Sequence, residues 1–142
     1  MTITKIRLKN FRQFVGLQEI DLSNTSDPTK NVVVIFGENG RGKTGIFRAL
    51  MFCLYGIKKL SQDADINEND LFLINKSVLE DNKNKVVECY VELEFKHDNN
   101  HYSIRRDLKG IFDGEKTYEE EGPKKGMITL PDGNSKVVPS EK

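Results

Sequence analysis

The chain has 142 residues, of which 37% are hydrophobic and 31% charged, and its mean hydropathy is −0.55. This length suits one domain or part of one. The 22 basic and 22 acidic residues cancel to a net charge of zero, which excludes a global electrostatic argument for a nucleic-acid partner. No apolar run reaches the ~18 residues of a membrane-spanning helix, and the N-terminus does not resemble a signal peptide. We therefore expect a cytoplasmic protein without membrane contact.

The first residues of the chain predict two strands. Residues 2–8 alternate apolar and basic side chains, which is typical of a strand with one face in water. A turn at Gly16 precedes a returning strand at residues 17–22, and residues 23–30 predict a turn-rich loop. Four basic side chains cluster here without acidic neighbours: Lys5, Arg7, Lys9 and Arg12. They leave two interpretations open, contact with DNA phosphates or an ordinary wet strand face.

Residues 37–44, Gly-Glu-Asn-Gly-Arg-Gly-Lys-Thr, match the G-x-x-x-x-G-K-[ST] pattern of a phosphate-binding P-loop. Glycine permits backbone angles with which successive N–H groups form an anion-binding nest. The helix that follows adds its unpaired N–H groups and the positive end of its dipole. In this pattern Lys43 reaches the β- and γ-phosphates, and the Thr44 hydroxyl ligates Mg²⁺. The alternative is a glycine-rich turn that matches by accident.

The segments on both sides of this loop fit the strand–loop–helix arrangement. Residues 32–36 are continuously apolar, which predicts a strand covered on both faces. Residues 43–55 predict a helix that ends at a C-cap, Gly56. Because Arg48 is almost the only polar residue beyond the first turn, we expect this helix to be enclosed on most sides.

The second half of the chain alternates irregular polar segments with strands. Residues 57–85 are irregular and charged, with an apolar island at residues 71–74. Residues 86–95 alternate without a slip and predict an antiparallel strand that forms a hairpin with residues 101–108. Residues 127–130 predict a last strand, followed by a turn at 131–134.

Several residues with reactive side chains carry no site in this interpretation. Cys53 and Cys89 lack the spacing of a metal or redox motif and predict buried thiols in a reducing compartment. His97 and His101 flank the hairpin turn without a third ligand and are expected to be exposed. Residues 110–125 are charged and turn-rich. The acidic side chains at 119–121 are expected to have no acid–base role, because no apolar pocket surrounds them.

The motifs that complete a nucleotide hydrolase are absent from this sequence. Hydrolysis needs a second carboxylate for Mg²⁺ and a residue that orients water, but no run of four apolar residues is followed by Asp or Asp-Glu, and no Leu-Ser-Gly-Gly occurs. The guanine motif Asn-Lys-x-Asp is only half matched at residues 75–78, because Val78 replaces the aspartate. We therefore predict a phosphate-binding fragment of a longer protein, without a catalytic residue of its own.

Asn10, Phe11 and Arg12, followed by a P-loop that contains Asn39, resemble the start of SMC/RecF/RecN ATPase heads. The strands at residues 91–95 and 102–106 resemble the hairpin of double-strand-break repair ATPases of the Rad-fifty type and of DndD, the ATPase of phosphorothioate-linked DNA restriction. The resemblance implies an α/β P-loop NTPase fold of the ABC-head type, with a mixed sheet, an antiparallel β-subdomain and a P-loop helix. We divide the chain into four parts: a P-loop core (1–56), an irregular segment (57–85), a β-hairpin subdomain (86–130) and a tail (131–142).

In that family a coiled coil separates this lobe from a C-terminal lobe that supplies the signature motif, the Mg²⁺ aspartate and the catalytic glutamate. Two heads close over two ATP molecules and thereby act on DNA. The resemblance thus implies ATP and Mg²⁺ as ligands, and as partners a C-terminal lobe, a second head of a homodimer and DNA. By position, it implies eleven ATP contacts, with Thr44 also ligating Mg²⁺: Arg12, Asn39, Gly40, Arg41, Gly42, Lys43, Thr44, Gly45, Asn75, Lys76 and Ser77.

Two features depart from the family pattern. Gly45 stands where a second Ser or Thr is usual, so a hydroxyl contact to the α-phosphate is lost while the backbone N–H remains. The family's glutamine-containing loop does not occur before Lys142. We expect the ATP-binding part of an ATPase for DNA repair or modification-dependent restriction. The alternatives are a non-hydrolytic, nucleotide-dependent interaction module and, ranked low because residues 57–85 lack the arginines of a lid, a small kinase.

Overall fold

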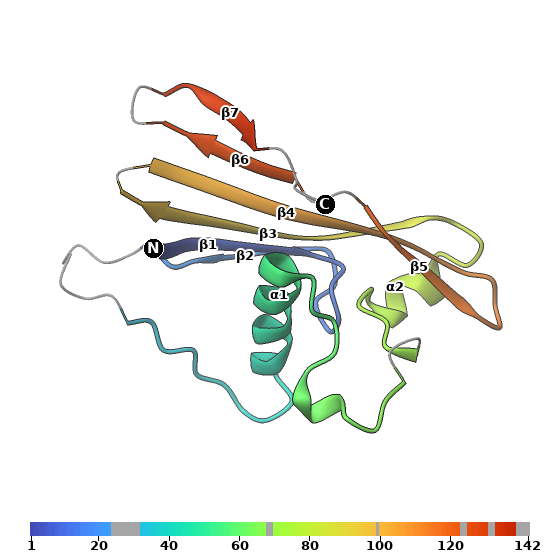
Figure 1. Cartoon of the computed structure of the whole chain (residues 1–142). Coiled ribbons are helices and arrows are strands. Elements are labelled where there is room, and N and C mark those ends of the chain that lie inside the picture. The colour runs from blue at the N-terminus through green and yellow to red at the C-terminus, as the bar shows by residue number, and fades with distance from the viewer. Residues whose placement is uncertain (24–31, 68–69, 99, 123–124, 131–132, 139–142) are drawn as a thin grey trace.

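The computed structural model describes residues 1–142 except 24–31, 68–69, 99, 123–124, 131–132 and 139–142. A seven-stranded sheet dominates it, in the order β2-β1-β3-β4-β6-β7, with β5 also paired to β4. Both helices and the long connecting segments lie on one side of this sheet (Figure 1). All strand pairs among the described residues are antiparallel. The expected mixed sheet is therefore wrong for this part of the chain.

The N-terminal strands place their apolar and charged side chains on opposite faces. Strand β1 (Thr2–Lys9) lies between β2 (Leu17–Asp21) and β3. Its apolar residues Ile6 and Leu8 are buried in the core. Because successive side chains of a strand alternate between faces, Lys5 and Arg7 lie on the opposite, solvent-facing side. The strand with one wet face, expected from the alternating sequence, is thereby confirmed.

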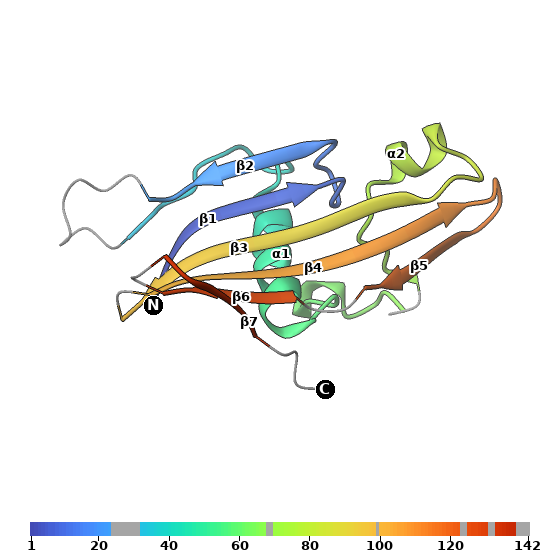
Figure 2. The same cartoon turned by 90° about the horizontal axis from the view of Figure 1, so that it is seen from above.

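The central hairpin is longer than predicted. It consists of β3 (Val87–His97) and β4 (Asn100–Phe112). The free edge of β4 carries β6 (Lys125–Thr129) along its first half and β5 (Thr117–Glu121) along its second half, as Figure 2 shows from above. Strand β7 (Ser135–Val138) pairs with β6 at the sheet's outer edge.

Besides the short 3₁₀ helix η1 (Ser61–Asp63), three elements were not predicted. Strand β5 lies in a segment expected to form charged turns, β7 lies in the predicted tail, and helix α2 (Lys76–Asp81) lies in the segment expected to be irregular. All three are short and polar, so neither a helical nor a strand period is visible in them. The loop predicted at residues 23–30 and the turn predicted at 131–134 lie partly outside the described residues, which omit 24–31 and 131–132.

Helix α1 (Lys43–Tyr55) has the predicted bounds, and Gly56 ends it with a left-handed backbone (φ 75°). Its buried face, which includes Ala49, Phe52 and Cys53, contacts β3 and β4. Its other faces are open, since Phe47 is 53% and Tyr55 67% exposed. The expectation that this helix is enclosed on most sides is therefore wrong for this chain.

Residues 32–36 form no strand, which corrects the prediction of a doubly covered one. The segment runs apart from the sheet toward the start of α1 (Figure 1). Its side chains are exposed, from 42% at Ile35 to 90% at Phe36. A doubly buried strand needs strands on both edges and cover on both faces. Neither surrounds residues 32–36 within the described part of the chain.

The core lies between the sheet, α1 and the segment that leads into α2. Its largest fully buried side chains include Phe11, Phe52, Leu73 and Leu93. Cys89 and Cys53 are buried, as predicted, and burial raises the pKa of the Cys89 thiol. No helix within the described residues is long and apolar enough to cross a bilayer.

A buried ion pair fastens α1 to the loop that follows it. Arg48 Nη1 and Nη2 bind the two oxygens of Asp63 at 2.6 and 2.9 Å, and both residues are buried. The Asp63 carboxylate also accepts the Leu60 N–H at 2.8 Å, while Arg48 donates to the Lys58 carbonyl. The Arg48 hydrogen bonds lower the pKa of Asp63 to about 2. Loss of either partner would leave an uncompensated buried charge.

We predict that Asp63→Asn lowers the free energy of unfolding by about 3 kcal/mol at pH 7, because Arg48 loses its counter-charge. The lowered pKa of Asp63 gives a stabilisation that is complete above about pH 4 and disappears toward pH 2. The difference between variant and unaltered chain should therefore shrink over that range in chemical denaturation. The exposed Asp65→Asn is the control, and equal stability of the two variants would contradict the prediction.

Candidate functional site

The turn after β1 is tied to a distant segment by backbone hydrogen bonds. The Arg12 N–H donates to the Leu73 carbonyl at 2.7 Å, and the Asn75 N–H donates to the Asn10 carbonyl at 2.8 Å. Phe11 and Ile74 accordingly form an isolated antiparallel bridge. Both Asn10 and Arg12 have left-handed backbones, with φ of 51° and 50°. The Asn-Phe-Arg triplet thus forms a sharp turn that joins the end of β1 to residues 73–75.

The three side chains of the triplet point to different places. Asn10 bonds the Glu88 carbonyl and accepts the Gly16 N–H, both at 2.9 Å. Phe11 is fully buried and stacks against Phe52 of α1, with ring centroids 6.1 Å apart. The Arg12 guanidinium donates to the Phe72 carbonyl at 2.8 Å, and its partial burial lowers its pKa. Arg12 is thus held beside the segment that leads into α2.

The structure separates the roles of the predicted site residues 75–77. Asn75 is buried and caps α2: its side chain accepts the Val78 N–H at 3.0 Å and donates to the Arg12 carbonyl at 2.6 Å. Lys76 and Ser77 are exposed, and Lys76 lies 3.6 Å from Glu80. Asn75 therefore contacts Arg12, and of residues 75–77 only Lys76 and Ser77 are exposed to solvent.

The P-loop residues form an open turn at the start of α1. Gly40 and Gly42 adopt left-handed backbones, with φ of 81° and 111°, which side-chain-bearing residues rarely adopt. Gly42 is the N-cap and provides no side-chain hydrogen bond to the helix. Lys43 folds back, and its Nζ contacts the carbonyls of Gly37 and Glu38 at 2.5 and 2.9 Å. The first turn of α1 thus keeps N–H groups without a side-chain cap.

The remaining P-loop side chains are open to solvent. Asn39, Arg41 and Thr44 are exposed, and Arg41 Nε lies 3.4 Å from Glu38. Gly45 is buried. Thr44 stands on the first turn of α1. No group of three acidic, histidine or cysteine residues that could hold a metal occurs among the described residues.

Arg12 also lines a cleft beside α2. The cleft has a volume of about 980 Å³ and is bordered by Arg12, Gln13, Lys76, Phe112 and Tyr118, among others. Gln13, the residue after Arg12, lies between this cleft and the P-loop glycines. Sequence reasoning passed over Gln13, because no motif includes it and only the fold brings it to α1.

The acidic run at 119–121 does not behave as predicted. The Glu119 side chain accepts the backbone N–H groups of Leu73 and Ile74 at 2.8 and 2.7 Å. Its burial raises the pKa of its carboxyl group, against the expectation that nothing there could shift it. Glu119 serves as a structural acceptor that holds the segment before α2.

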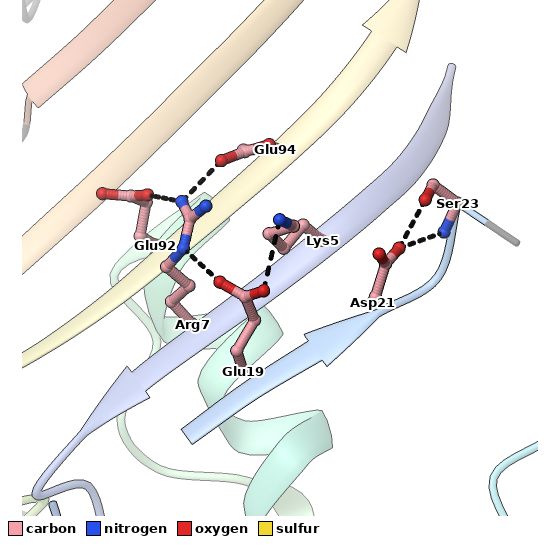
Figure 3. A network of polar contacts seen from close by, with 7 residues as sticks. All are labelled: Lys5, Arg7, Glu19, Asp21, Ser23, Glu92 and Glu94. Atoms are coloured by element: carbon pink, nitrogen blue, oxygen red, sulfur yellow. Dashed lines mark hydrogen bonds and ion pairs between the residues drawn. The ribbon is translucent and has the colours of Figure 1, made fainter. Parts of the chain in front are cut away.

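The basic side chains of β1 are neutralised across the sheet. Arg7 lies opposite Glu19 of β2 and Glu92 of β3, and it also contacts Glu94, as Figure 3 shows. Its Nε binds Glu19 at 2.7 Å, and the same carboxylate accepts from Lys5 at 3.2 Å. Lys9 lies 3.6 Å from Glu88. These pairs favour an ordinary wet strand face over a contact site for DNA phosphates.

The chain is similar to known proteins along almost its whole length. A protein-family model described as "AAA domain" matches residues 5–138. The chain is 34% identical over 123 residues to "DNA double-strand break repair Rad50 ATPase" of Methanocaldococcus jannaschii, a match that covers 87% of the chain and 10% of that protein. It is 34% identical over 112 residues to the SbcC component of the nuclease SbcCD of Staphylococcus saprophyticus, covering 79% of the chain and 10% of that protein.

A second Rad50 ATPase, of Thermoplasma acidophilum, is 30% identical over 135 residues, which covers 95% of the chain and 12% of that protein. The chain thus spans about a tenth of the length of the curated relatives that it matches. These matches agree with the resemblance carried by Asn10, Phe11, Arg12 and the P-loop.

We predict that Glu119→Ala lowers the free energy of unfolding by about 2 kcal/mol, because two backbone N–H groups lose their acceptor. Glu119→Gln keeps an oxygen acceptor and removes a partly buried charge, so its effect should stay within about 0.5 kcal/mol. The exposed Glu120→Ala is the matched control. Urea denaturation measures all three, and equal losses for the Ala and Gln variants would exclude the acceptor role.

Proposed function

Because the chain belongs to the AAA domain family and is the N-terminal head region of an SMC- or Rad50-like ABC ATPase, we propose that residues 37–44 bind the phosphates of ATP. The observation that carries this proposal is the open turn at α1. Gly40 and Gly42 give it left-handed backbones, and no side chain caps the helix. A phosphate group is the ligand that such uncapped N–H groups and the positive helix end favour.

Each predicted P-loop residue has a role in this proposal. The backbone N–H groups of residues 39–45, Gly45 included, surround the phosphates, and Asn39 and Arg41 edge the loop. Lys43 exchanges the carbonyls of Gly37 and Glu38 for phosphate oxygens. Thr44, exposed on the first turn, ligates Mg²⁺.

We place the rest of the nucleotide toward the cleft that Arg12 and Lys76 line. Arg12 approaches the phosphates from its position at the Phe72 carbonyl, while Lys76 and Ser77 reach the ribose or base from the start of α2. Asn75 acts indirectly, since both ends of its amide are occupied by the Val78 N–H and the Arg12 carbonyl. Asn75 thereby positions α2 and the turn that carries Arg12.

Hydrolysis requires carboxylates from outside this chain. The described residues offer no metal-holding acidic cluster, and the chain spans about a tenth of its relatives. We propose that a C-terminal lobe supplies the magnesium aspartate and catalytic glutamate, and that a second head completes a homodimer. The exposed apolar segment 32–36 and the open face of α1 are the surfaces that this lobe would cover, because removing their apolar side chains from water is favourable.

The names of the relatives support a proposal for the biological role. We propose that the complete protein is an ATPase of the cytoplasm that acts in DNA repair, with modification-dependent restriction as the second setting. DNA would be engaged by the complete complex. This proposal does not place DNA on β1, because Lys5, Arg7 and Lys9 are already paired with glutamates there.

We predict that the complete protein hydrolyses ATP with Mg²⁺, while the 142-residue chain binds ATP weakly and turns it over negligibly. Lys43→Ala should reduce the ATPase activity of the complete protein at least about 100-fold, because Lys43 stabilises charge on the transferred phosphate. The exposed Lys85→Ala is the control and should leave activity unchanged. Robust hydrolysis by the 142-residue chain, abolished by Lys43→Ala, would show that the catalytic groups lie within it.

The same assay distinguishes the alternative, a non-hydrolytic interaction module. In that case the complete protein binds ATP through Lys43 but releases it unchanged, and its continuation beyond this chain lacks an apolar run that ends in Asp-Glu.

A further inference from the structure

Two glycines at the start of α1 are buried although the loop around them is open. Gly42 and Gly45 are buried, whereas Arg41, Lys43 and Thr44 are exposed. The cover comes from the turn after β1. A Cβ atom on Gly45 would lie 2.4 Å from Gln13 Nε2 and 2.6 Å from Gln13 Oε1. A Cβ on Gly42 would lie 2.9 Å from the same Nε2 and 2.9 Å from the Phe14 ring.

The Gln13 amide therefore occupies the space where a side chain at position 45 would start. Gly45 itself offers no hydroxyl to a ligand. The amide replaces it with a polar group that can both donate and accept. One side of Gln13 rests on the P-loop, and the other lines the cleft beside α2.

No hydrogen bond among the described residues accounts for this amide as a structural group. Gln13 is exposed overall, and its amide makes no hydrogen bond to any residue that the structure describes. The turn that carries it is held instead by backbone bonds of Asn10 and Arg12 to residues 73–75. Its donor and acceptor are thus available at the place where α1 begins.

We propose that Gln13 is a phosphate-binding residue that donates its Nε2–H to an α- or β-phosphate oxygen and takes the place of a hydroxyl at position 45. This inference rests on the proposed function, because it requires a nucleotide in the P-loop. It also explains why residue 45 is glycine: a side chain there would displace the amide. Gln13 and a hydroxyl at position 45 are alternative solutions to the same contact.

The test measures the affinity of the complete protein for ATP·Mg²⁺ and for ADP·Mg²⁺ in four forms: unaltered, Gln13→Ala, Gly45→Ser and the double variant. Gln13→Ala should weaken both nucleotides by the same factor, roughly tenfold, because a hydrogen bond to a charged group is lost from a phosphate that they share. Gly45→Ser alone should give no gain, since the amide crowds the new Cβ. The double variant should bind within about threefold of the unaltered protein, because the hydroxyl then reaches the ligand.

A merely structural role for Gln13 would lower the melting temperature of Gln13→Ala without nucleotide, whereas a phosphate-binding role leaves it unchanged. The melting temperature without nucleotide should be unchanged in Gln13→Ala, and the exposed Gln18→Ala of β2 should change neither affinity nor stability. Gln13→Glu keeps the length of the side chain but replaces the donor with a negative charge, so it should bind more weakly than Gln13→Ala.

The outcomes separate this inference from the proposed function. If the unaltered protein does not bind ATP, or Lys43→Ala leaves binding intact, the proposed function itself fails. If Lys43→Ala abolishes binding while Gln13→Ala leaves both affinities unchanged, only the role of Gln13 is overturned. Equal weakening in Gln13→Ala and the double variant would also overturn it, because the two positions would then not exchange roles.

Discussion

The hydrogen bonds between residues 10–12 and residues 73–75 are the constraint on which the site depends. They join segments about sixty residues apart in the sequence, and they place Arg12 and Asn75, two of the site residues outside the P-loop. Phe11 enters the core against Phe52, Arg12 reaches the cleft, and Gln13 comes to rest on the P-loop glycines. Glu119 holds the same segment by accepting two of its backbone N–H groups. Because loop closure over such a span costs entropy, many weak bonds must form together to maintain it.

Apolar side chains beside the P-loop are exposed to solvent in this structure. The antiparallel sheet, α1 and the segment before α2 bury a common core, but residues 32–36 and one face of α1 are exposed. The polar groups show the same division: the P-loop residues are all present, while the described residues hold no metal-binding acidic cluster. In the proposed function, the nucleotide and the C-terminal lobe would meet at adjoining surfaces, which would couple nucleotide binding to the assembly of the lobes.

Local features were predictable from the sequence, and contacts between distant segments were not. The bounds of α1 follow from its apolar residues and Gly56, and the alternation at residues 86–95 identifies β3. By contrast, α2 depends on Asn75 bonding the Arg12 carbonyl, and the burial of Glu119 depends on two N–H groups far away in sequence. The apolar composition of residues 32–36 predicts a buried strand, because apolar side chains favour burial. Within the described residues, however, no neighbouring strand or covering layer surrounds this segment. Gln13 left no signal except the missing hydroxyl at Gly45.

The exposed apolar run at residues 32–36 has a consequence for biosynthesis. If the complete protein is about ten times longer, as the relatives are, this run would leave the ribosome well before the C-terminal lobe that we propose to cover it. At about 5–20 residues per second, that delay is on the order of a minute. During this time an apolar segment with unpaired backbone edges resembles the seed of an intermolecular sheet. Chaperone binding to the nascent chain, or early binding of nucleotide to residues 37–44, would therefore raise the yield of folded protein before any catalytic cycle begins.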